Sequence, residues 1–499
     1  MAVSSCQRPE RAPGNGVAPK TSNTTKAFCT VKQHIQYLGQ DQHVCVVGLG
    51  YVGLTLAITL AKIGFHVTGI EKRADIVAQL KAGHAHFYEP DIDTMLQEMQ
   101  AAGRLDIYQQ LPDDSPSTVY IITVGTPLGD NNKPRQDFIE AAATELADKM
   151  PDGSLIVLRS TVKLGTSRHI VAPILEASGK SFHLAFCPER TTEGKALQEL
   201  RYLPQIVSGY NFESLVRASE LFQFITPIVI KVSELEVAEM VKMVDNTQRD
   251  LYFAYANEVA SLCDAAGIPA GEVINAGNFH YPRNNMPSPG LVGGPCLSKD
   301  SYLLMESMAP FNVYPKITMA ARHINEEQPA VCARFIKNRA DEMGIDPTTI
   351  SILGLAFKGA PETDDLRGTT ATFLIDELRL CFPNAALQGY DAVVSAADIE
   401  AFGLKPVQTI EQAFNSSRIV VIHNNHQSFR SLPLGYLSRQ MQTPSIIYDF
   451  WNLFDHEKLD LADHVLYASL GNHCATEQAK RMREAMAVHQ ATTPTRQSA

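Results

Sequence analysis

The chain has 499 residues, of which 45% are hydrophobic and 19% charged, and its formal net charge is −11. This length is enough for two or three domains, and the composition is that of an ordinary soluble globular protein. The acidic balance leaves no basic footprint and disfavours nucleic acid as a partner. No apolar run approaches the roughly 18 residues that cross a bilayer, so we expect no membrane association.

The nine cysteines are odd in number and scattered, and no two of them form a CxxC pair. This usage disfavours a disulfide framework or a zinc ribbon, so we expect no metal site and a reducing, cytoplasmic location. Residues 1 to about 25 are rich in Ser, Thr, Asn, Pro and Gly. Such a segment buries too little surface to become ordered, so we expect a disordered tail, with a short helix from Phe28 to Leu38. The polar tail beyond Cys474 is expected to fray.

A glycine-rich turn follows the first apolar run, Val44 to Val47, and precedes a helix-like stretch. Gly48 allows the tight turn, Gly50 lets the backbone approach a pyrophosphate, and Gly53 permits close packing of helix on strand. The predicted cofactor-binding positions of this turn are Gly48, Gly50, Tyr51, Val52 and Gly53.

A second predicted strand, His66 to Ile70, ends at Glu71, which lies 23 residues beyond Gly48. An acid at this place binds a ribose diol and disfavours the extra phosphate of NADP, so we predict NAD as the cofactor. The alternative is a glycine turn without a ligand. It is the weaker interpretation, because strand, helix and acid occur together.

Three further strand-like runs, Val119–Val124, Leu155–Leu158 and Phe182–Phe186, alternate with helical stretches, as in a parallel doubly wound sheet. Each run is followed by a short segment with polar residues, and these are Gly125-Thr126-Pro127, Ser160-Thr161-Val162 and Cys187-Pro188-Glu189-Arg190. Ligands bind at the carboxyl ends of such strands, so these residues predict a pocket. Singly, each could merely cap a helix or shape a turn.

Lys231 to Ala266 predicts one long helix, because no Pro or Gly interrupts it before Gly267. It carries a polar stripe with spacings of three and four, formed by Glu239, Lys242, Asn246 and Arg249. The stripe is either a solvated helix face or a functional one. Apolar residues on nearly all sides of the second half of the helix favour burial between domains or subunits.

The segment Gly293-Gly294-Pro295-Cys296-Leu297-Ser298-Lys299-Asp300 sets a thiol in a glycine-flanked turn, with an ammonium and a carboxylate three and four residues later. The preceding Tyr281–Gly290 is crowded with Pro, Asn and Gly and predicts an irregular loop. A neighbouring cation promotes the thiolate, which is a strong nucleophile. The alternative for any single cysteine is a small core hydrophobe.

Thr349 to Gly359 opens a second α/β unit, with further strands expected at Ala386–Tyr390, Ile419–His423 and Ser445–Asp449. Its first turn lacks GxGxxG, so a second dinucleotide is not expected there. Four charged residues follow the first strand, namely Lys358, Asp364, Asp365 and Arg367. They form either a charged surface loop or a contact to a phosphate or a partner subunit.

Taken in order, the motifs closely resemble those of the UDP-glucose/GDP-mannose dehydrogenase family. They are GLGYVGL, YEP at 88–90, VGTP at 124–127, ST at 160–161, PER and EGKALQEL within 188–200, KMVDN at 242–246, GGPCLSKD and GLAFKG. The resemblance covers roughly residues 43 to 470. It implies two Rossmann-like, doubly wound parallel-sheet domains joined by a long central helix.

The implied activity is an NAD-dependent, four-electron oxidation of carbon 6 of a nucleotide sugar to the uronic acid, feeding polysaccharide biosynthesis. In the family's mechanism a cysteine captures the aldehyde as a thiohemiacetal, a second hydride leaves to give a thioester, and water releases the acid. Cys296 would be the nucleophile. Donors that stabilise oxyanion character would be Lys242 and Asn246, and groups that position or activate water would be Asp300, Glu189 and Thr161.

The resemblance also implies ligand contacts and an assembly. NAD contacts are extended to Thr126 and Thr161, and the substrate contacts are Glu189, Arg190, Lys242, Arg283, Gly293, Lys299, Lys358 and Arg367. The implied regions are an N-terminal extension (1–40), an NAD-binding domain (41–230), a central helical dimerisation and catalytic-loop domain (231–340), a UDP-sugar-binding domain (341–475) and a tail (476–499). The expected partners are a UDP-sugar and a second copy of the chain, in a homodimer or a higher homo-oligomer.

The sugar is indicated by two segments that point in different directions. The PER-x-x-EGKALxEL segment is more similar to members that oxidise UDP-N-acetylhexosamines, which makes UDP-N-acetyl-D-mannosamine the first candidate beside UDP-N-acetylglucosamine. Lys299-Asp300 after the cysteine is closer to the UDP-glucose type, so UDP-glucose remains an alternative. A further alternative is a binding protein that no longer turns over, which would need a missing catalytic group.

Overall fold

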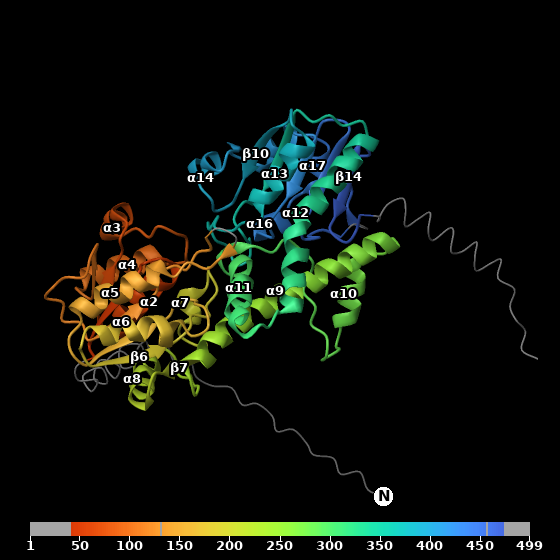
Figure 1. Cartoon of the computed structure of the whole chain (residues 1–499). Helices are drawn as coiled ribbons and strands as arrows, with labels where there is room; N and C mark the ends of the chain where they lie inside the picture. Colours follow the sequence, from red (N-terminus) through yellow and green to blue (C-terminus); the bar gives the residue numbers. More distant parts are fainter. Residues whose placement is uncertain (1–40, 130–131, 456–457, 474–499) are drawn as a thin grey trace, which may run out of the picture.

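The computed structural model describes residues 41–129, 132–455 and 458–473, and it contains two α/β units joined by a helical centre (Figure 1). The expected fold class, two Rossmann-like domains connected by a long helix, is confirmed. The predictions for the N-terminal extension, for a helix at Phe28–Leu38 and for the tail lie outside the described residues.

The first unit is an eight-stranded sheet in the order β3-β2-β1-β4-β5-β6-β7-β8. Its strands are β1 (His43–Val47), β2 (His66–Ile70), β3 (Leu105–Tyr108), β4 (Val119–Ile122), β5 (Ser154–Leu158), β6 (Phe182–Phe186), β7 (Gln205–Gly209) and β8 (Val229–Lys231). The strands that the sequence predicted in this unit pair in parallel, whereas β7, which the sequence did not predict, runs antiparallel to β6. Only the short helix α7 (Ala196–Glu199) lies between them, so no full crossover returns the chain to the opposite edge.

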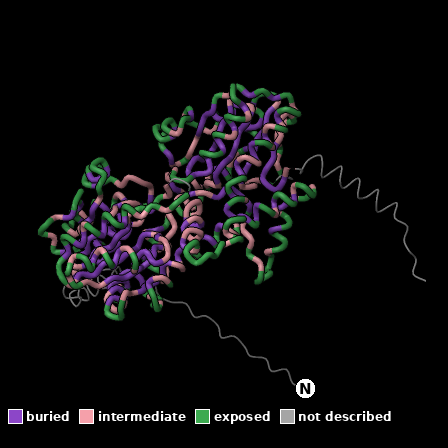
Figure 2. The backbone as a smooth tube through the Cα atoms, viewed as in Figure 1, coloured by how far each residue is buried: buried purple, intermediate pink, exposed green. Residues whose placement is uncertain are grey.

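Helices pack on both faces of this sheet, so its central strands are apolar on both sides. The helices are α2 (Tyr51–Ile63), α3 (Ala74–Lys81), α4 (Ile92–Ala101), α5 (Asp137–Lys149), α6 (Ala172–Ala177) after a π-helical turn (Ser167–Val171), and α8 (Phe212–Gln223). In β1, Val44 and Val46 join the core beneath α2, whereas Cys45 and Val47 join the core beneath α5. The buried strands form the inner layer of the unit (Figure 2).

The second unit is a six-stranded sheet in the order β11-β10-β9-β12-β13-β14. Its strands are β9 (Thr349–Leu353), β10 (Ala386–Tyr390), β11 (Lys405–Pro406), β12 (Ile419–Ile422), β13 (Ser445–Asp449) and β14 (Val465–Ser469). Its helices are α13 (Ala371–Cys381), α14 (Ala396–Ala401), α15 (Ile410–Asn415), α16 (Gln427–Arg430) and α17 (Leu434–Ser438). The four strands predicted here are present, and β11 and β14 extend the sheet at its two edges.

Four helices form the centre: α9 (Leu235–Ala266), α10 (Ala270–Asn278), α11 (Gly294–Met308) and α12 (Lys316–Glu342). The long helix begins at Leu235 rather than at Lys231, because Val229–Lys231 pairs with β7 as an edge strand. It ends at Gly267 with φ 71°, as predicted, and it packs against both α11 and α12. Among the described helices, none combines the length and the apolar character that a bilayer crossing requires.

Gly53 offers a test of helix-on-strand packing. A Cβ on Gly53 would lie 1.8 Å from the carbonyl oxygen of Gly48 and 2.6 Å from Oγ1 of Thr123. Relief of this clash would require the backbone at Gly48 to move. We therefore expect Gly53→Ala to lower the free energy of unfolding by about 2 to 3 kcal/mol in urea titrations. Gly50→Ala is the matched control, because Gly50 has φ −65° and no heavy atom within 4 Å of its Cβ position. Equal stability of the two variants would contradict the packing argument.

Candidate active site

The glycine turn has the shape that a dinucleotide requires. Gly48 adopts φ 93°, and Gly50 caps the N-terminus of α2 with open space where a Cβ would stand. Glu71 follows β2, and its carboxylate accepts hydrogen bonds from the amides of Leu49 (3.2 Å) and Arg73 (3.0 Å). The turn, the helix N-terminus and the acid therefore meet at one edge of the sheet, so these residues fit the pyrophosphate and ribose of NAD.

The two residues that follow Gly50, Tyr51 and Val52, differ in their contacts. The Tyr51 hydroxyl contacts the Glu89 carboxylate and accepts a hydrogen bond from the Gly194 amide (2.5 Å), while Val52 is only partly buried. The side chain of Tyr51 thus ties the YEP segment to the loop after β6. Only its backbone remains for a cofactor at the helix N-terminus.

The ends of β4 and β5 meet through two threonines and a lysine. Thr126 Oγ1 donates to the carbonyl of Thr161 (2.6 Å), and Lys299 Nζ of α11 donates to Thr126 Oγ1 (3.1 Å). Because β4, β5 and β6 are neighbours in the sheet, the three polar strand ends lie side by side, as predicted. Lys299 thereby links the helix that carries the cysteine to the NAD-binding sheet.

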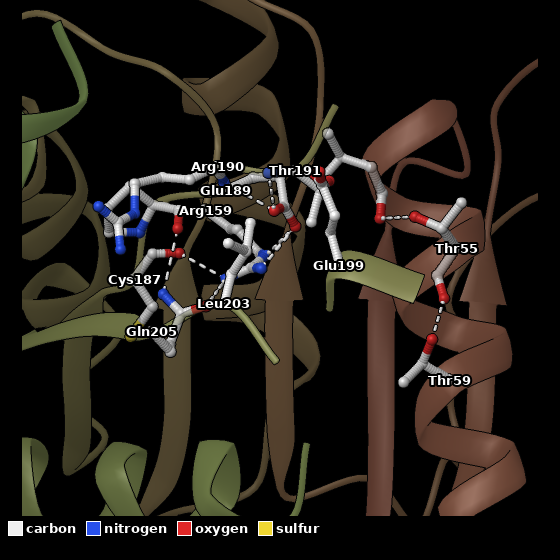
Figure 3. Close-up of polar contacts among 12 residues, drawn as sticks. Thr55, Thr59, Arg159, Cys187, Glu189, Arg190, Thr191, Glu199, Leu203 and Gln205 are labelled. Carbon is white, nitrogen blue, oxygen red and sulfur yellow. Dashed lines mark hydrogen bonds and ion pairs between the residues drawn. The ribbon is translucent and has the colours of Figure 1, made fainter. Parts of the chain in front are cut away.

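Glu189, after β6, is locked in a buried ion pair that the sequence did not predict (Figure 3). Its Oε2 accepts from Arg159 Nη2 (2.5 Å), and its Oε1 accepts from the amides of Arg190 (2.7 Å) and Thr191 (2.8 Å). Burial alone would raise the pKa of Glu189, but Arg159 and the amide donors outweigh burial and leave this pKa below its ordinary value. A carboxylate with both oxygens occupied is suited to positioning rather than to proton abstraction.

Arg190 is the next residue along this loop. Its Nη2 donates to the carbonyl of Pro204 (2.6 Å), and its Nη1 lies 3.5 Å from Asp245 of α9. The guanidinium is therefore already engaged by the protein. Its predicted contact with substrate stays a prediction.

Cys296 lies in the first turn of α11, whereas the sequence predicted only a glycine-flanked turn at this residue. Gly293 caps the helix, Gly294 has φ 93° and donates its amide to the Gly368 carbonyl (2.7 Å), and Pro295 occupies the first turn, where proline is favoured. The preceding 281–290 segment is irregular, as predicted. A helix N-terminus favours a thiolate through its dipole and free amides.

Charged and polar groups surround the thiol. Asn246 Nδ2 donates to Asp300 Oδ2 (2.5 Å), and Lys299 Nζ lies 3.2 Å from Asp300 Oδ1. Desolvation raises the pKa of the Cys296 thiol, and Asp300 adds to this effect, while Lys242 and Lys299 oppose it. Lys242 is buried, and no hydrogen bond or ion pair recorded within the described residues engages its ammonium. An uncommitted cation therefore lies close to the only exposed thiol among the described free cysteines.

The polar stripe of α9 is not a solvated face. Glu239, Lys242 and Asn246 are buried, and the exposed Arg249 reaches back to contact the Asn246 amide oxygen. Glu239 accepts hydrogen bonds from the amides of Gly165 (2.6 Å) and Ser167 (2.9 Å). The stripe thus faces the site and also holds the loop that follows Thr161.

The charged cluster of the second unit lies beside the same cysteine. Lys358 Nζ donates to the carbonyl of Glu193 (2.7 Å), and Arg367 Nη2 lies 2.6 Å from Asp365 and 3.5 Å from Glu193. Burial first, and then Asp365, raise the pKa of Glu193 to about 8, although Arg367 and Lys358 oppose the shift. The charges of Lys358 and Arg367 act on Cys296, so this cluster lies close to the cysteine, and its role in contacting a phosphate or a partner subunit stays a prediction.

Arg283 is a predicted substrate contact, and its described contacts are with Tyr281. Its Nε donates to the Tyr281 hydroxyl (3.0 Å), and its guanidinium lies 4.6 Å from the centre of that ring. These described contacts stay within the exposed loop after α10.

Sequence reasoning missed Arg159 and Glu89, although each left a signal. Arg159 directly follows the apolar strand β5, where it is expected to be buried. A buried cation requires a carboxylate partner. Glu89 belongs to the recognised YEP motif, but its contact with Tyr51 joins residues 38 positions apart and has no local pattern.

A dinucleotide turn and a cysteine helix between two Rossmann-like sheets define an NAD-dependent oxidoreductase. Residues 42–226, 236–327 and 351–456 match the NAD-binding, central and UDP-binding domains of the UDP-glucose/GDP-mannose dehydrogenase family. The chain belongs to this family of nucleotide-sugar dehydrogenases, and NAD as its cofactor is confirmed.

Several relatives share most of the chain. It is 32% identical over 412 residues to the UDP-N-acetyl-D-mannosamine dehydrogenase of Pyrococcus horikoshii, which covers 81% of this chain and 94% of that protein. It is 29% identical to the UDP-N-acetyl-D-glucosamine 6-dehydrogenase of Pseudomonas aeruginosa, with 85% and 99% covered. The solved structure of UDP-D-ManNAc dehydrogenase from Pyrococcus horikoshii aligns with a TM-score of 0.78 at 30% identity, covering 87% of this chain and all of that one (100%).

Glu239 predicts a pH dependence of stability. Burial raises its pKa to about 7, although amide donors oppose the shift. When the pKa of a carboxyl group is higher in the folded than in the unfolded protein, both states are protonated at low pH and the free energy of unfolding is unaffected. As pH rises from the unfolded pKa to the folded pKa, the unfolded state loses its proton first, and the free energy of unfolding falls. We expect the unfolding free energy of the wild type, relative to Glu239→Gln, to fall by about 3 kcal/mol from about pH 4.5 to about pH 8. The free energies of unfolding of the two proteins are measured by urea titration at several pH values. A difference between them that does not change with pH would contradict the raised pKa of Glu239, because the loss of one hydrogen-bond acceptor alone changes stability equally at every pH.

Proposed function

We propose that this protein oxidises carbon 6 of a UDP-N-acetylhexosamine, with UDP-N-acetyl-D-mannosamine as the first candidate, to the uronic acid. The observation that carries the proposal is the exposed Cys296 at a helix N-terminus beside the uncommitted, buried ammonium of Lys242. The match to a UDP-binding domain and relatives named as dehydrogenases of UDP-N-acetylmannosamine and UDP-N-acetylglucosamine support the substrate class.

The proposed chemistry has two oxidations. Removal of a hydride from carbon 6 and of the hydroxyl proton converts the alcohol to an aldehyde. The Cys296 thiolate adds to the aldehyde carbon, and the oxygen takes up a proton, which gives a thiohemiacetal. Loss of a second hydride and of the hydroxyl proton gives a thioester, and water then breaks the carbon–sulfur bond to release the acid and the thiol. Bound NAD supplies the hydride acceptor, and two NAD are reduced for each acid formed.

The surrounding residues have distinct roles in this proposal. The ammonium of Lys242 and the amide of Asn246 stabilise negative charge on the carbon 6 oxygen, because both lie where burial strengthens electrostatic interactions. Asp300 is the base that receives the proton of the attacking water, and its Oδ1 has no hydrogen bond among the described contacts, only the Lys299 ion pair. Glu189, fixed by Arg159, positions that water together with Thr161.

The UDP-glucose alternative rested on Lys299-Asp300 after the cysteine. Lys299 bonds Thr126 and Asp300, so this dipeptide joins α11 to the NAD-binding sheet and does not by itself favour a sugar. The acetylated sugar therefore remains the proposed substrate.

A substrate panel tests the proposed function. Purified protein with NAD is offered UDP-N-acetylmannosamine, UDP-N-acetylglucosamine, UDP-glucose and GDP-mannose, and NADH and sugar acid are both measured. We expect two NADH for each acid, with the highest kcat/KM for UDP-N-acetylmannosamine. One NADH for each oxidised sugar would refute the thioester scheme, and binding of NAD and UDP without any turnover would favour a non-catalytic binding protein.

Substitution of the nucleophile gives a second prediction. Cys296→Ser should lower acid formation on the order of a thousandfold or more, because a hydroxyl of ordinary pKa cannot replace the thiolate. NAD binding, measured by calorimetry, should stay nearly unchanged. Cys381→Ser is the control, since this half-buried cysteine lies on α13 of the second unit. Retained acid formation in Cys296→Ser would eliminate the covalent scheme.

The proposal includes a homodimer built along α9. Five large apolar residues of this helix are exposed in the single chain: Val237, Val244, Tyr252, Tyr255 and Leu262. An exposed apolar face of this length is typical of a protein interface. We expect light scattering to show a dimer or a multiple of one, and Tyr255→Glu with Leu262→Glu to halve the mass. The control Tyr436→Glu, at an exposed position of the second unit, should leave the mass unchanged, and a monomeric wild type would refute the proposal.

A further inference from the structure

A polar network lies behind the cysteine, within the packing of three central helices. Its members are Asp250 and Asn257 on α9, Ser301 on α11, and Arg322 and Asn325 on α12. Each is at most 2% exposed. The proposed chemistry uses none of them, and buried polar groups of this number need a reason to be retained.

Arg322 donates hydrogen bonds to the backbone on both sides of the nucleophile. Its Nη1 donates to the carbonyl of Leu297 (2.9 Å), directly after Cys296, and its Nη2 donates to the carbonyl of Val292 (3.3 Å), before it. Asp250 Oδ1 accepts from the same Nη1 (2.8 Å). Because the guanidinium is planar and its direction is fixed by a carboxylate, the two carbonyls are held at a set separation.

The remaining members hold the same segment at its two ends. Asn257 accepts from the Gly290 amide (2.9 Å) and donates to the Gly290 carbonyl (3.0 Å). Ser301 Oγ donates to Asp250 Oδ2 (3.0 Å), and Asn325 Nδ2 donates to Asp250 Oδ1 (2.8 Å). The irregular segment before the cysteine and the helix after it are therefore tied to one carboxylate.

The opposite side of this segment is closed by the second unit. A Cβ on Gly290 would lie 2.7 Å from the Trp451 ring, and a Cβ on Gly293 would lie 2.5 Å from the carbonyl oxygen of Gly368. The cysteine segment is thus held between a polar network on one side and tightly packed groups on the other. Loss of one bond of the network would therefore loosen the segment on the side of the helices.

We infer that Asp250, Asn257, Ser301, Arg322 and Asn325 are positioning residues that aim the Cys296 thiol at carbon 6 for the second oxidation. The inference rests on the proposed function for that step. The first oxidation needs no carbon–sulfur bond, so a displaced sulfur slows the second step and spares the first. A network that only stabilised the helices would affect both steps in proportion.

The test compares Arg322→Lys with a matched control, Arg217→Lys. Arg217 also binds one carboxylate, Asp41 (2.6 Å), and a backbone carbonyl, Gly153 (2.5 Å), but within the first sheet unit. Single-turnover NADH formation, with the aldehyde trapped by hydroxylamine, measures the first step, and acid formation from the supplied 6-aldehyde measures the second. Arg322→Lys should slow the second step at least tenfold and the first less than twofold, whereas Arg217→Lys should change their ratio less than twofold.

Two further measurements keep the inference testable if Arg322→Lys folds poorly or if no sugar is turned over. Ser301→Ala removes one bond to Asp250 and should slow the second step about threefold. Amide hydrogen exchange of peptides spanning 288–300, without ligand, should accelerate at least tenfold in Arg322→Lys and stay unchanged in Arg217→Lys. Equal slowing of both steps, or unchanged exchange in this segment, would overturn the inference. If exchange accelerates in this segment but the protein oxidises no sugar, the network does fix the segment and the proposed function is refuted.

Discussion

The site depends on the close contact between the start of α11 and the second sheet unit. The Gly294 amide donates to the Gly368 carbonyl, and a Cβ on Gly294 would lie 2.4 Å from the Phe357 ring. Only glycine combines φ 93° with this lack of space. Because the helix begins at this contact, Cys296 and the free amides of the first turn of α11 lie at the boundary between the central helices and the second sheet unit.

The carboxylates of the site are largely satisfied by partners among the described residues. Glu189 is bound by Arg159, and Asp300 is held by Asn246 and Lys299. A buried carboxylate without such partners would be strongly disfavoured. The buried ammonium of Lys242 makes no hydrogen bond or ion pair among the described residues, although its charge helps to lower the pKa of Glu189, and the proposed function assigns to it the stabilisation of negative charge on the substrate.

The two sheet units are also joined by contacts that involve the cofactor turn. Tyr51 at the N-terminus of α2 contacts Glu89, and the neighbouring Tyr88 donates its amide to Asp364 of the second unit (2.9 Å). The Gly194 amide donates to Glu89 (2.8 Å), and the adjoining Glu193 receives Lys358. The dinucleotide turn, the loop after β6 and the charged cluster of the second unit thus form one continuous polar contact.

The sequence by itself determined the glycine turn, the long helix and most of the strands, whereas β3, β7, β8, β11 and β14 were not predicted. The glycine turn with Glu71, the strands and the long helix depend on local periodicity and on the conformational limits of Gly and Pro, which are properties of neighbouring residues. Only the tertiary structure decided that Cys296 begins a helix, that β7 runs antiparallel to β6, and that Arg159 neutralises Glu189. The same holds for the pairing of Asp250 with Arg322 across 72 positions. A buried charge selects its partner by position in space, and no local pattern encodes such a choice.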